Sequence, residues 1–205
     1  MTDSLIGALV IALSILVPMM PGMAHHMEMM KPGPEVPPGW SYNPSSWHQR
    51  APLIALGFIG WFISRYLAAF QLGYIPTAWD PFFGESTMKV LTSKVSRMWP
   101  ISDAGLGAVA YTIEALMAFM GGTSRWRTMP WMVAFFGILV VPLGIVHILL
   151  VISMPVVVGH WCALCLAAAT TMLFMIPLTV DEVVAMVQFM PVSYTHLTLP
   201  TILRV

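Results

Sequence analysis

The sequence predicts an all-α integral membrane protein, and three observations support this class. Of its 205 residues, 58% are hydrophobic and only 9% are charged, whereas soluble domains carry roughly 25% charged residues. The mean hydropathy is +0.81. Five apolar stretches are close to the roughly 17–25 residues that a helix needs to cross a bilayer. The formal net charge is zero, which removes any argument for a nucleic acid partner or a polybasic membrane patch. The hydrophobic composition makes the lipid bilayer the expected surroundings.

The predicted transmembrane helices cover residues 4–20, 52–75, 104–122, 130–155 and 158–178. The first is the shortest and would also suit a signal segment. Its start, MTDS, carries an acidic residue and no basic one, which is untypical of a signal peptide. We therefore interpret it as a span. The proline-, glycine-, methionine- and histidine-rich stretch that follows, up to residue 51, is predicted to be a loop because proline interrupts helices.

Basic residues in the short connections predict the orientation. Residues 76–102 form a loop with the aromatic run WDPFFG, and its second half is predicted to be a short helix that ends at Pro100. The segment TSRWRTM, residues 123–129, is predicted to be a tight turn. Short basic loops stay in the cytoplasm, so Arg125 and Arg127 place this turn inside, and Arg50 agrees. Three basic residues of the outer loop disagree, namely Lys89, Lys94 and Arg97. The prediction is a multi-pass inner-membrane protein with its N-terminus outside.

The chain has two cysteines, Cys162 and Cys165, which form a C-x-x-C pair at the start of the last predicted helix. Residues i and i+3 share a helix face, so the pair can close a disulfide. A helix N-terminus also favours a thiolate, and Trp161 lies where an interfacial aromatic residue is expected. This pattern indicates a redox couple at the boundary of water and lipid. Two alternatives stay open: packing of two small side chains, or a zinc site to which His160 would contribute.

The run VLTSKVSRMWPISDAGLGAVAY, residues 90–111, and the later HWCALC resemble the vitamin K epoxide reductase family, including its bacterial disulfide-forming members. The shared pattern is Val-Leu-x-Ser, a short amphipathic turn, a proline and Gly-x-x-x-Tyr at the opening of a span. One more span and a C-x-x-C at the start of the next complete it. The resemblance covers about residues 52–180. It implies a membrane four-helix bundle holding a quinone beside the cysteines, and the N-terminal span would be one extra transmembrane helix.

The resemblance also implies roles for individual residues. The two cysteines would be the catalytic pair, passing electrons between thiols and a ubiquinone- or menaquinone-type quinone, with Cys165 facing the ring. Asp103 stands where some members have a quinone-binding asparagine. The implied function is a membrane thiol–quinone oxidoreductase, with its active site on the extracytoplasmic side and a thioredoxin-like or other dithiol protein as partner. The implied quinone-binding residues are Ser93, Asp103, Gly107 and Tyr111.

Two departures from the family pattern affect this interpretation. Family members usually carry a second cysteine pair in the outer loop, which relays electrons to the membrane pair, and the corresponding positions here are Trp79 and Thr87. The tyrosine that some members have four residues after the second active-site cysteine is Ala169. An external dithiol would therefore have to reach Cys162 directly, or the chain would work with another subunit. The alternative function is a non-catalytic membrane subunit or scaffold of the same fold.

Two charges inside the predicted spans suggest an ion pair. Glu114 lies on the same helical stripe as Asp103 and Tyr111. Counting residues from the outer ends of the spans places Glu114 and Arg65 at a similar depth of about 15 Å. Charged residues within a bilayer usually face the bundle interior and a partner. We therefore predict an Arg65–Glu114 ion pair with His147 as a neighbour, serving either helix packing or a proton relay.

Two further segments lie outside the bundle. Residues 19–30, MMPGMAHHMEMM, contain six methionines and two histidines. These ligands suit Cu(I), so a copper-handling membrane protein is a third hypothesis. The end of the chain, VSYTHLTLPTILRV, resembles a translated sequencing adapter and is excluded from the prediction of the fold. The predicted divisions are residues 1–51, the bundle at 52–180, and a non-native tail at 192–205.

Overall fold

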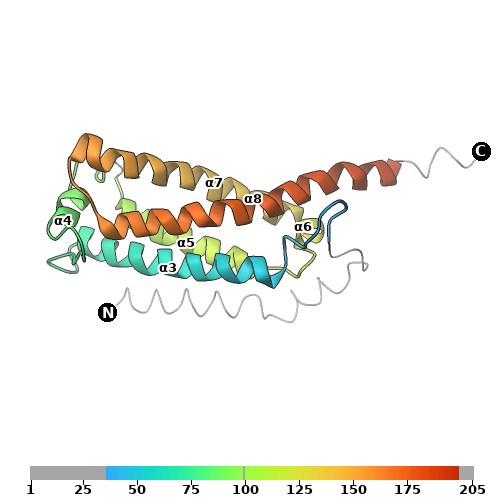
Figure 1. Ribbon diagram of the computed structural model, residues 1–205, viewed down its shortest axis with the longest axis horizontal. Coiled ribbons are helices and arrows are strands. Elements are labelled where there is room, and N and C mark those ends of the chain that lie inside the picture. Colours follow the sequence, from blue (N-terminus) through green and yellow to red (C-terminus); the bar gives the residue numbers. More distant parts are fainter. Residues whose placement is uncertain (1–35, 99, 199–205) are drawn as a thin grey trace, which may run out of the picture.

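The computed structural model describes residues 36–98 and 100–198, and in this part of the chain every regular element is a helix (Figure 1). This confirms the predicted all-α class. The first predicted span and the methionine-rich segment 19–30 lie outside the described residues. Of the predicted tail at 192–205, the backbone is described as far as Thr198, as the end of the last helix.

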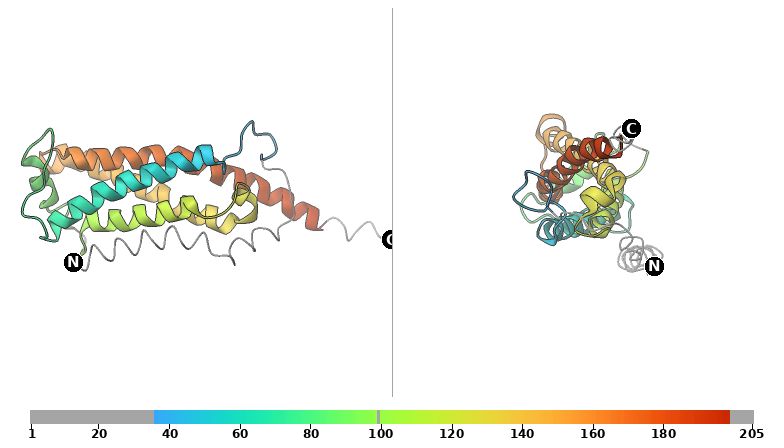
Figure 2. Two further views of the ribbon diagram at one scale, coloured as in Figure 1. Left: turned by 90° about the horizontal axis from the view of Figure 1, so that it is seen from below. Right: turned by 90° about the vertical axis from the view of Figure 1, so that its right-hand side faces the viewer.

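Four long helices form the bundle, and two short helices lie at its ends (Figures 1 and 2). Helix α3 packs against α5 and α8, and α7 packs against α8. Figure 1 shows α4 at one end and α6 at the opposite end, with α8 extending past α6; we name these the α4 end and the α6 end. The elements are α3 (Trp47–Gln71), α4 (Ser86–Leu91), α5 (Asp103–Phe119), α6 (Arg125–Thr128), α7 (Pro130–Ser153) and α8 (Ala163–Thr198).

The long helices have the lengths and surfaces of membrane spans. By length and composition, three described segments can cross a bilayer: α3, α7 with the turn that follows it, and α8 as far as Phe189. Helix α5 has 17 residues and extends about 25 Å beside them. Large apolar side chains such as Ile138, Leu149 and Phe174 are exposed on α7 and α8, where lipid would cover them. The chain is therefore a membrane protein.

Glycines in the left-handed region set two helix boundaries at the α4 end. Gly73, with φ +77°, follows the end of α3. Gly159, with φ +70°, follows the π-helical turn Met154–Val158 that ends α7. Helix α8 consequently begins at Ala163, later than the predicted start at residue 158, and it continues beyond the predicted end at 178.

Two predicted connections differ from the structure. The second half of the loop does contain a short helix, α4, but its predicted end at Pro100 is wrong, because α4 ends at Leu91 and is followed by turns. The predicted tight turn at 123–129 contains the single helical turn α6. Both differences concern short elements whose ends depend on contacts with the bundle rather than on hydrophobic periodicity.

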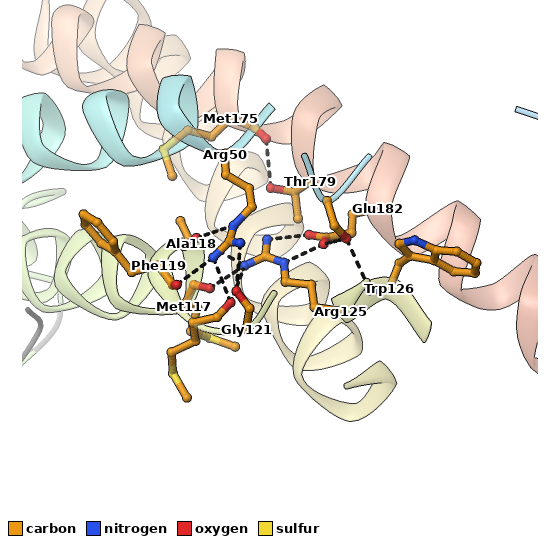
Figure 3. Close-up of polar contacts among 12 residues, drawn as sticks. Arg50, Met117, Ala118, Phe119, Gly121, Arg125, Trp126, Met175, Thr179 and Glu182 are labelled. Atoms are coloured by element: carbon orange, nitrogen blue, oxygen red, sulfur yellow. Dashed lines mark hydrogen bonds and ion pairs between the residues drawn. The ribbon is translucent and has the colours of Figure 1, made fainter. Parts of the chain in front are cut away.

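A buried ion pair holds the α6 end together (Figure 3). Arg125 and Glu182 lie 2.5 Å apart with both side chains 1% exposed, and the Ser45 hydroxyl also donates to Glu182. The pair connects α6 to the part of α8 that lies beyond the predicted last span. Separating two buried opposite charges leaves each without compensation, so this pair fixes the position of α8 against α6.

The same end uses arginines to bind the last carbonyls of α5 (Figure 3). Arg50 donates to the carbonyl oxygens of Ala118 at 2.8 Å and Phe119 at 2.6 Å, and Arg125 donates to that of Met117 at 2.7 Å. These carbonyls have no partner within the helix, and a cation is favoured at a helix C-terminus. Arg50 and Arg125 are therefore buried structural groups, and the predicted orientation depends on the remaining arginine of the turn, at position 127.

Candidate active site

The two cysteines form a disulfide at the α4 end, which confirms that their spacing suits one. Cys162 is the residue immediately before α8 and Cys165 lies in its first turn, with the Cα atoms 5.2 Å apart. The Sγ atom of Cys162 accepts a hydrogen bond from the backbone N–H of Cys165 at 3.0 Å. Cys162 is fully buried, whereas Cys165 is partly exposed. The two sulfurs therefore differ in accessibility.

A cavity of about 50 Å³ lies against Cys165. Its wall includes Ser93 and Asp103, so the structure brings together three of the predicted site residues. The other lining residues come from α4, the turns after it and the end of α7: Val90, Leu91, Val95, Ser96, Leu150, Ser153, Met154 and Val158. The second cysteine of the pair thus faces a mostly apolar space with hydroxyl and carboxyl groups on one side.

Asp103 is held by a polar network that the sequence did not predict. Its carboxylate accepts hydrogen bonds from the side-chain amide of Gln71 at 2.5 Å and from the Ser96 hydroxyl at 2.8 Å. The amide oxygen of Gln71 in turn accepts from the Ser102 hydroxyl. The network joins the end of α3 to the start of α5. It fixes the Asp103 carboxylate at the edge of the cavity.

A larger cleft of about 500 Å³ lies on the other side of this network. It shares Leu91 and Ser96 with the small cavity, and Gln71 and Ser102 also line it. Ligand pockets for small molecules typically enclose about 300–1,000 Å³. The large cleft has this size, whereas the small cavity beside Cys165 does not. The Gln71–Ser96–Asp103 network separates the two spaces.

Gly107 and Tyr111, two of the predicted quinone-binding residues, do not line the cavity. A Cβ at Gly107 would lie 3.3 Å from the Ser64 hydroxyl oxygen, so this glycine permits close packing of α5 on α3. The Tyr111 hydroxyl is buried and donates to the carbonyl of Ala168 at 2.6 Å, and it lies 3.1 Å from the Thr171 hydroxyl. Both residues join helices in the bundle interior.

The predicted Arg65–Glu114 ion pair is wrong. Glu114 is fully buried, and neither of its carboxylate oxygens has a hydrogen-bond partner within the described part of the chain. The Arg65 guanidinium lies 5.3 Å from the centre of the Trp61 ring on its own helix. His147 lies next to Tyr111, with Nε2 3.5 Å from the hydroxyl. Residue counting gave similar depths for the two charges but not the direction in which each side chain points.

Asp80 is a residue of the site that sequence reasoning missed. Its carboxylate accepts hydrogen bonds from the backbone N–H of Ala163, the first residue of α8, at 2.9 Å, and from those of Phe82 and Phe83. The Thr87 hydroxyl is a fourth donor. Burial raises the pKa of the Asp80 carboxyl, but the hydrogen bonds from Thr87 and the three N–H groups outweigh it and hold the pKa below its usual value. Asp80 therefore places a carboxylate beside the disulfide.

Comparison with known proteins agrees with this geometry. A family model described as the vitamin K epoxide reductase family matches residues 51–180. The chain belongs to the vitamin K epoxide reductase family. The matched segment contains the disulfide, the cavity and Asp80, and membership identifies the chain as a membrane oxidoreductase from a family that acts with quinones. Neither the curated proteins nor the solved structures contain a match to the chain.

The two positions at which the resemblance predicts relay cysteines, 79 and 87, differ in their surroundings. Trp79 is 68% exposed, and its backbone N–H donates to the Tyr66 hydroxyl at 2.7 Å. Thr87 is fully buried and donates to Asp80. Ala169, at the position of the family tyrosine, is also buried. Position 87 therefore holds a hydroxyl that supports Asp80 rather than a thiol.

The described residues provide no alternative metal site. Among residues 36–98 and 100–189, no group of three or more histidine, cysteine, aspartate or glutamate side chains is placed to hold a metal ion. In particular, His160 and the disulfide-bonded cysteines form no zinc site. The predicted copper segment, residues 19–30, lies outside the described part of the chain.

Proposed function

We propose that this protein is a membrane thiol–quinone oxidoreductase that uses the Cys162–Cys165 pair. The observation that carries the proposal is the position of Cys165 on the wall of a cavity that Ser93 and Asp103 also line. A bound quinone, of the ubiquinone or menaquinone type, would accept the two electrons and two protons that the dithiol releases on forming a disulfide. The substrates are then a quinone on one side of the pair and a protein dithiol on the other.

The side chains around the cavity suit the two redox states of such a ligand. A quinone oxygen accepts hydrogen bonds, and a serine hydroxyl is a donor. The Ser93 oxygen accepts the backbone N–H of Ser96 at 3.3 Å, and we assign its own hydroxyl proton to the quinone oxygen. An ionised carboxylate only accepts, so Asp103 suits the hydroxyl of the reduced form. Ser93 and Asp103 would therefore favour opposite redox states of the ring.

Binding at this position requires the wall between the two spaces to move. The space beside Cys165 is about 50 Å³, whereas the adjoining cleft is about 500 Å³. A liquid water molecule takes up about 30 Å³, so a ring does not fit in the smaller space as it stands. Displacement of Ser96 or Gln71 would join the two spaces. Likewise, because Cys162 is fully buried and packs with Val90 of α4 and Met154 of the turn after α7, a protein dithiol can attack it only after these neighbours move.

The decisive experiment measures quinone reduction by the purified protein in detergent. Dithiothreitol serves as the dithiol and a short-chain ubiquinone as the acceptor, and the rate without protein is subtracted. Cys165→Ser and Cys162→Ser are each expected to lower the rate at least about 100-fold, because exchange needs both sulfurs. Ser93→Ala is expected to raise KM for the quinone. Thr128→Ala is the matched control, because the Thr128 hydroxyl donates to the carbonyl of Ser124 in the α6 turn, at the opposite end of the bundle.

Retained activity in Cys165→Ser would contradict the proposal. A wild-type protein that reduces no quinone, yet folds with an intact disulfide, would favour the non-catalytic subunit of the same fold.

We further propose that the protein lies in the inner membrane with the α4 end on the extracytoplasmic side. Arg127, in the turn at the opposite end, supports this orientation because short basic loops stay in the cytoplasm. A single cysteine introduced at the exposed Lys94 of a Cys162→Ser/Cys165→Ser background tests it. A membrane-impermeant maleimide is expected to label this cysteine in intact spheroplasts, and labelling only after lysis would reverse the orientation.

A further inference from the structure

The N-terminus of α8 is shared by two acceptors of different charge. A helix begins with N–H groups that have no partner within the helix and carries partial positive charge at that end. Here the N–H of Ala163 is bound by the Asp80 carboxylate at 2.9 Å, and the N–H of Cys165 is bound by the sulfur of Cys162 at 3.0 Å. The carboxylate and the sulfur thus occupy the same helix end.

The surroundings of these two groups contain little water. Cys162 and Thr87 are fully buried and Asp80 is 7% exposed. Charges interact more strongly in such a site than in bulk water. The donors to Asp80 are a hydroxyl and three backbone N–H groups, and all of them are neutral. Its negative charge is therefore solvated by dipoles but not cancelled.

Reduction of the disulfide changes what this charge acts on. In the disulfide both sulfurs are neutral, whereas in the dithiol form Cys162 can ionise. The helix N-terminus and the Cys165 N–H would stabilise a Cys162 thiolate, as they do for reactive cysteines in general. The Asp80 carboxylate, bound one residue further along, opposes that ionisation because like charges repel. It therefore destabilises the reduced form relative to the disulfide.

We propose that Asp80 is a positioning residue that sets the reduction potential of the Cys162–Cys165 pair, holding it lower than the helix N-terminus alone would. This inference rests on the proposed function, because a potential matters only for a pair that cycles. It gives Thr87, at the position of a relay cysteine, a definite role: the hydroxyl holds and partly solvates the carboxylate. The protein would thereby favour the disulfide, the form that can accept electrons from a dithiol partner.

The test is a redox equilibrium of the purified full-length protein in detergent, without quinone or protein partner. Mixtures of reduced and oxidised dithiothreitol are allowed to equilibrate with the cysteine pair. When the protein is reduced, its S–S bond breaks, the S–S bond of cyclic dithiothreitol forms, and two electrons and two protons pass from dithiothreitol to the protein. The dithiol fraction is read by maleimide gel shift at one fixed neutral pH. Failure of quinone reduction would not affect this measurement.

Asp80→Asn keeps an oxygen acceptor for Ala163 and removes the charge. At a given dithiothreitol ratio, its dithiol-to-disulfide ratio is expected to rise about tenfold, which is about 30 mV for a two-electron couple. Asp181→Asn is the matched control, because that carboxylate also belongs to α8 but bonds the Tyr42 hydroxyl far from the disulfide. It is expected to leave the ratio unchanged.

Thr87→Val keeps the charge and removes one neutral donor, so it should shift the ratio the opposite way, by about twofold in favour of the disulfide. This second variant serves if Asp80→Asn does not fold. An unchanged or lower ratio in Asp80→Asn, or a higher ratio in Thr87→Val, would overturn the proposal and leave Asp80 as a cap of purely structural value.

Discussion

The α6 end and the α4 end of the bundle both place charged side chains at helix termini, but they compensate these charges differently. At the α6 end, Arg125 meets Glu182 directly at 2.5 Å, and arginines bind the last carbonyls of α5. At the α4 end, Asp80 and Asp103 accept hydrogen bonds from hydroxyl, amide and backbone N–H groups, all of which are neutral. Each arrangement complements the dipole of the helix that it touches.

The two ways of compensating charge suit different roles: the ion pair stabilises the fold, whereas the carboxylates can take part in the chemistry of the site. A buried ion pair whose partners are fully desolvated is costly to break, and it holds one geometry. A carboxylate held by neutral dipoles keeps its negative charge, so it interacts electrostatically with nearby groups. The charges at the α6 end therefore cancel each other. The carboxylates at the α4 end, where the disulfide lies, keep charge that can act on a sulfur or a ligand. The following predictions test whether this division holds.

The largest effect is expected for Glu182→Gln. It leaves the buried Arg125 guanidinium facing a neutral amide, and breaking a buried pair in this way costs about 3–5 kcal/mol of stability. Thermal unfolding in detergent, followed by tryptophan fluorescence, measures the loss. Asp181→Asn, one residue earlier, removes a carboxylate whose bond to Tyr42 lies at the surface and should cost less than about 1 kcal/mol. A changed dithiol-to-disulfide ratio in Glu182→Gln would show that the two ends are coupled.

The next effect is expected for Arg50→Met. The guanidinium donates to four carbonyls at the end of α5, and a hydrogen bond to a charged group is worth about 1.5–3 kcal/mol. Because water can replace part of these contacts, we expect a total loss of about 3 kcal/mol. Arg127→Met makes the same change at a partly exposed arginine of the adjacent turn and should cost little. Equal losses in the two variants would show that capping of α5 contributes nothing specific.

The sequence predicted the parts of the molecule that depend on local composition. Hydropathy located the four helices of the bundle, and the C-x-x-C spacing identified the disulfide. The resemblance predicted that Ser93 and Asp103 belong to the same site as Cys165, and the structure places all three around one cavity. The resemblance also implied Tyr111, which does not line this cavity, because eight residues along a helix from Asp103 correspond to about 12 Å of depth. A shared helical face does not imply a shared site.

The residues that sequence reasoning missed make contacts between distant segments. Asp80 binds Ala163, which lies 83 positions later, and Glu182 lies beyond the predicted end of the last span. The predicted Arg65–Glu114 pair failed for a related reason, since similar depth leaves the rotation of each helix undetermined. Loop folds and helix rotations are set by tertiary packing, and hydrophobic periodicity carries little information about either.

A smaller effect tests the middle of the bundle, where neither type of charge compensation operates. A Cβ at Gly60 would lie 2.5 Å from Cζ of the Tyr111 ring and closer still to its Cε1, whereas one at Gly57, a turn earlier on α3, would lie 3.4 Å from the Ala115 Cβ. Gly60→Ala is therefore expected to cost about 1–3 kcal/mol by overpacking. Gly57→Ala should be neutral or slightly stabilising, because alanine favours a helix by up to about 1 kcal/mol. Thermal unfolding of the pair measures the difference, and equal stabilities would mean that Tyr111 can move at no cost.

The smallest effect on stability, and the finest test of the α4 end, is expected for Asp103→Asn. The new side chain keeps an oxygen for Gln71 and Ala104, which both bond the same carboxylate oxygen now, so stability should fall by only about 1 kcal/mol. Its amide group, however, can donate to a quinone oxygen, which the carboxylate cannot.

If Asp103 faces the ligand, KM for the quinone should therefore fall by about fivefold while inhibition by the corresponding quinol weakens, since a good neutral hydrogen bond is worth about 1 kcal/mol. Steady-state rates with added quinol measure both constants. A variant in which both constants move in the same direction would mean that Asp103 acts on the shape of the site alone. The neutral network at the α4 end would then have the same structural purpose as the ion pair at the α6 end.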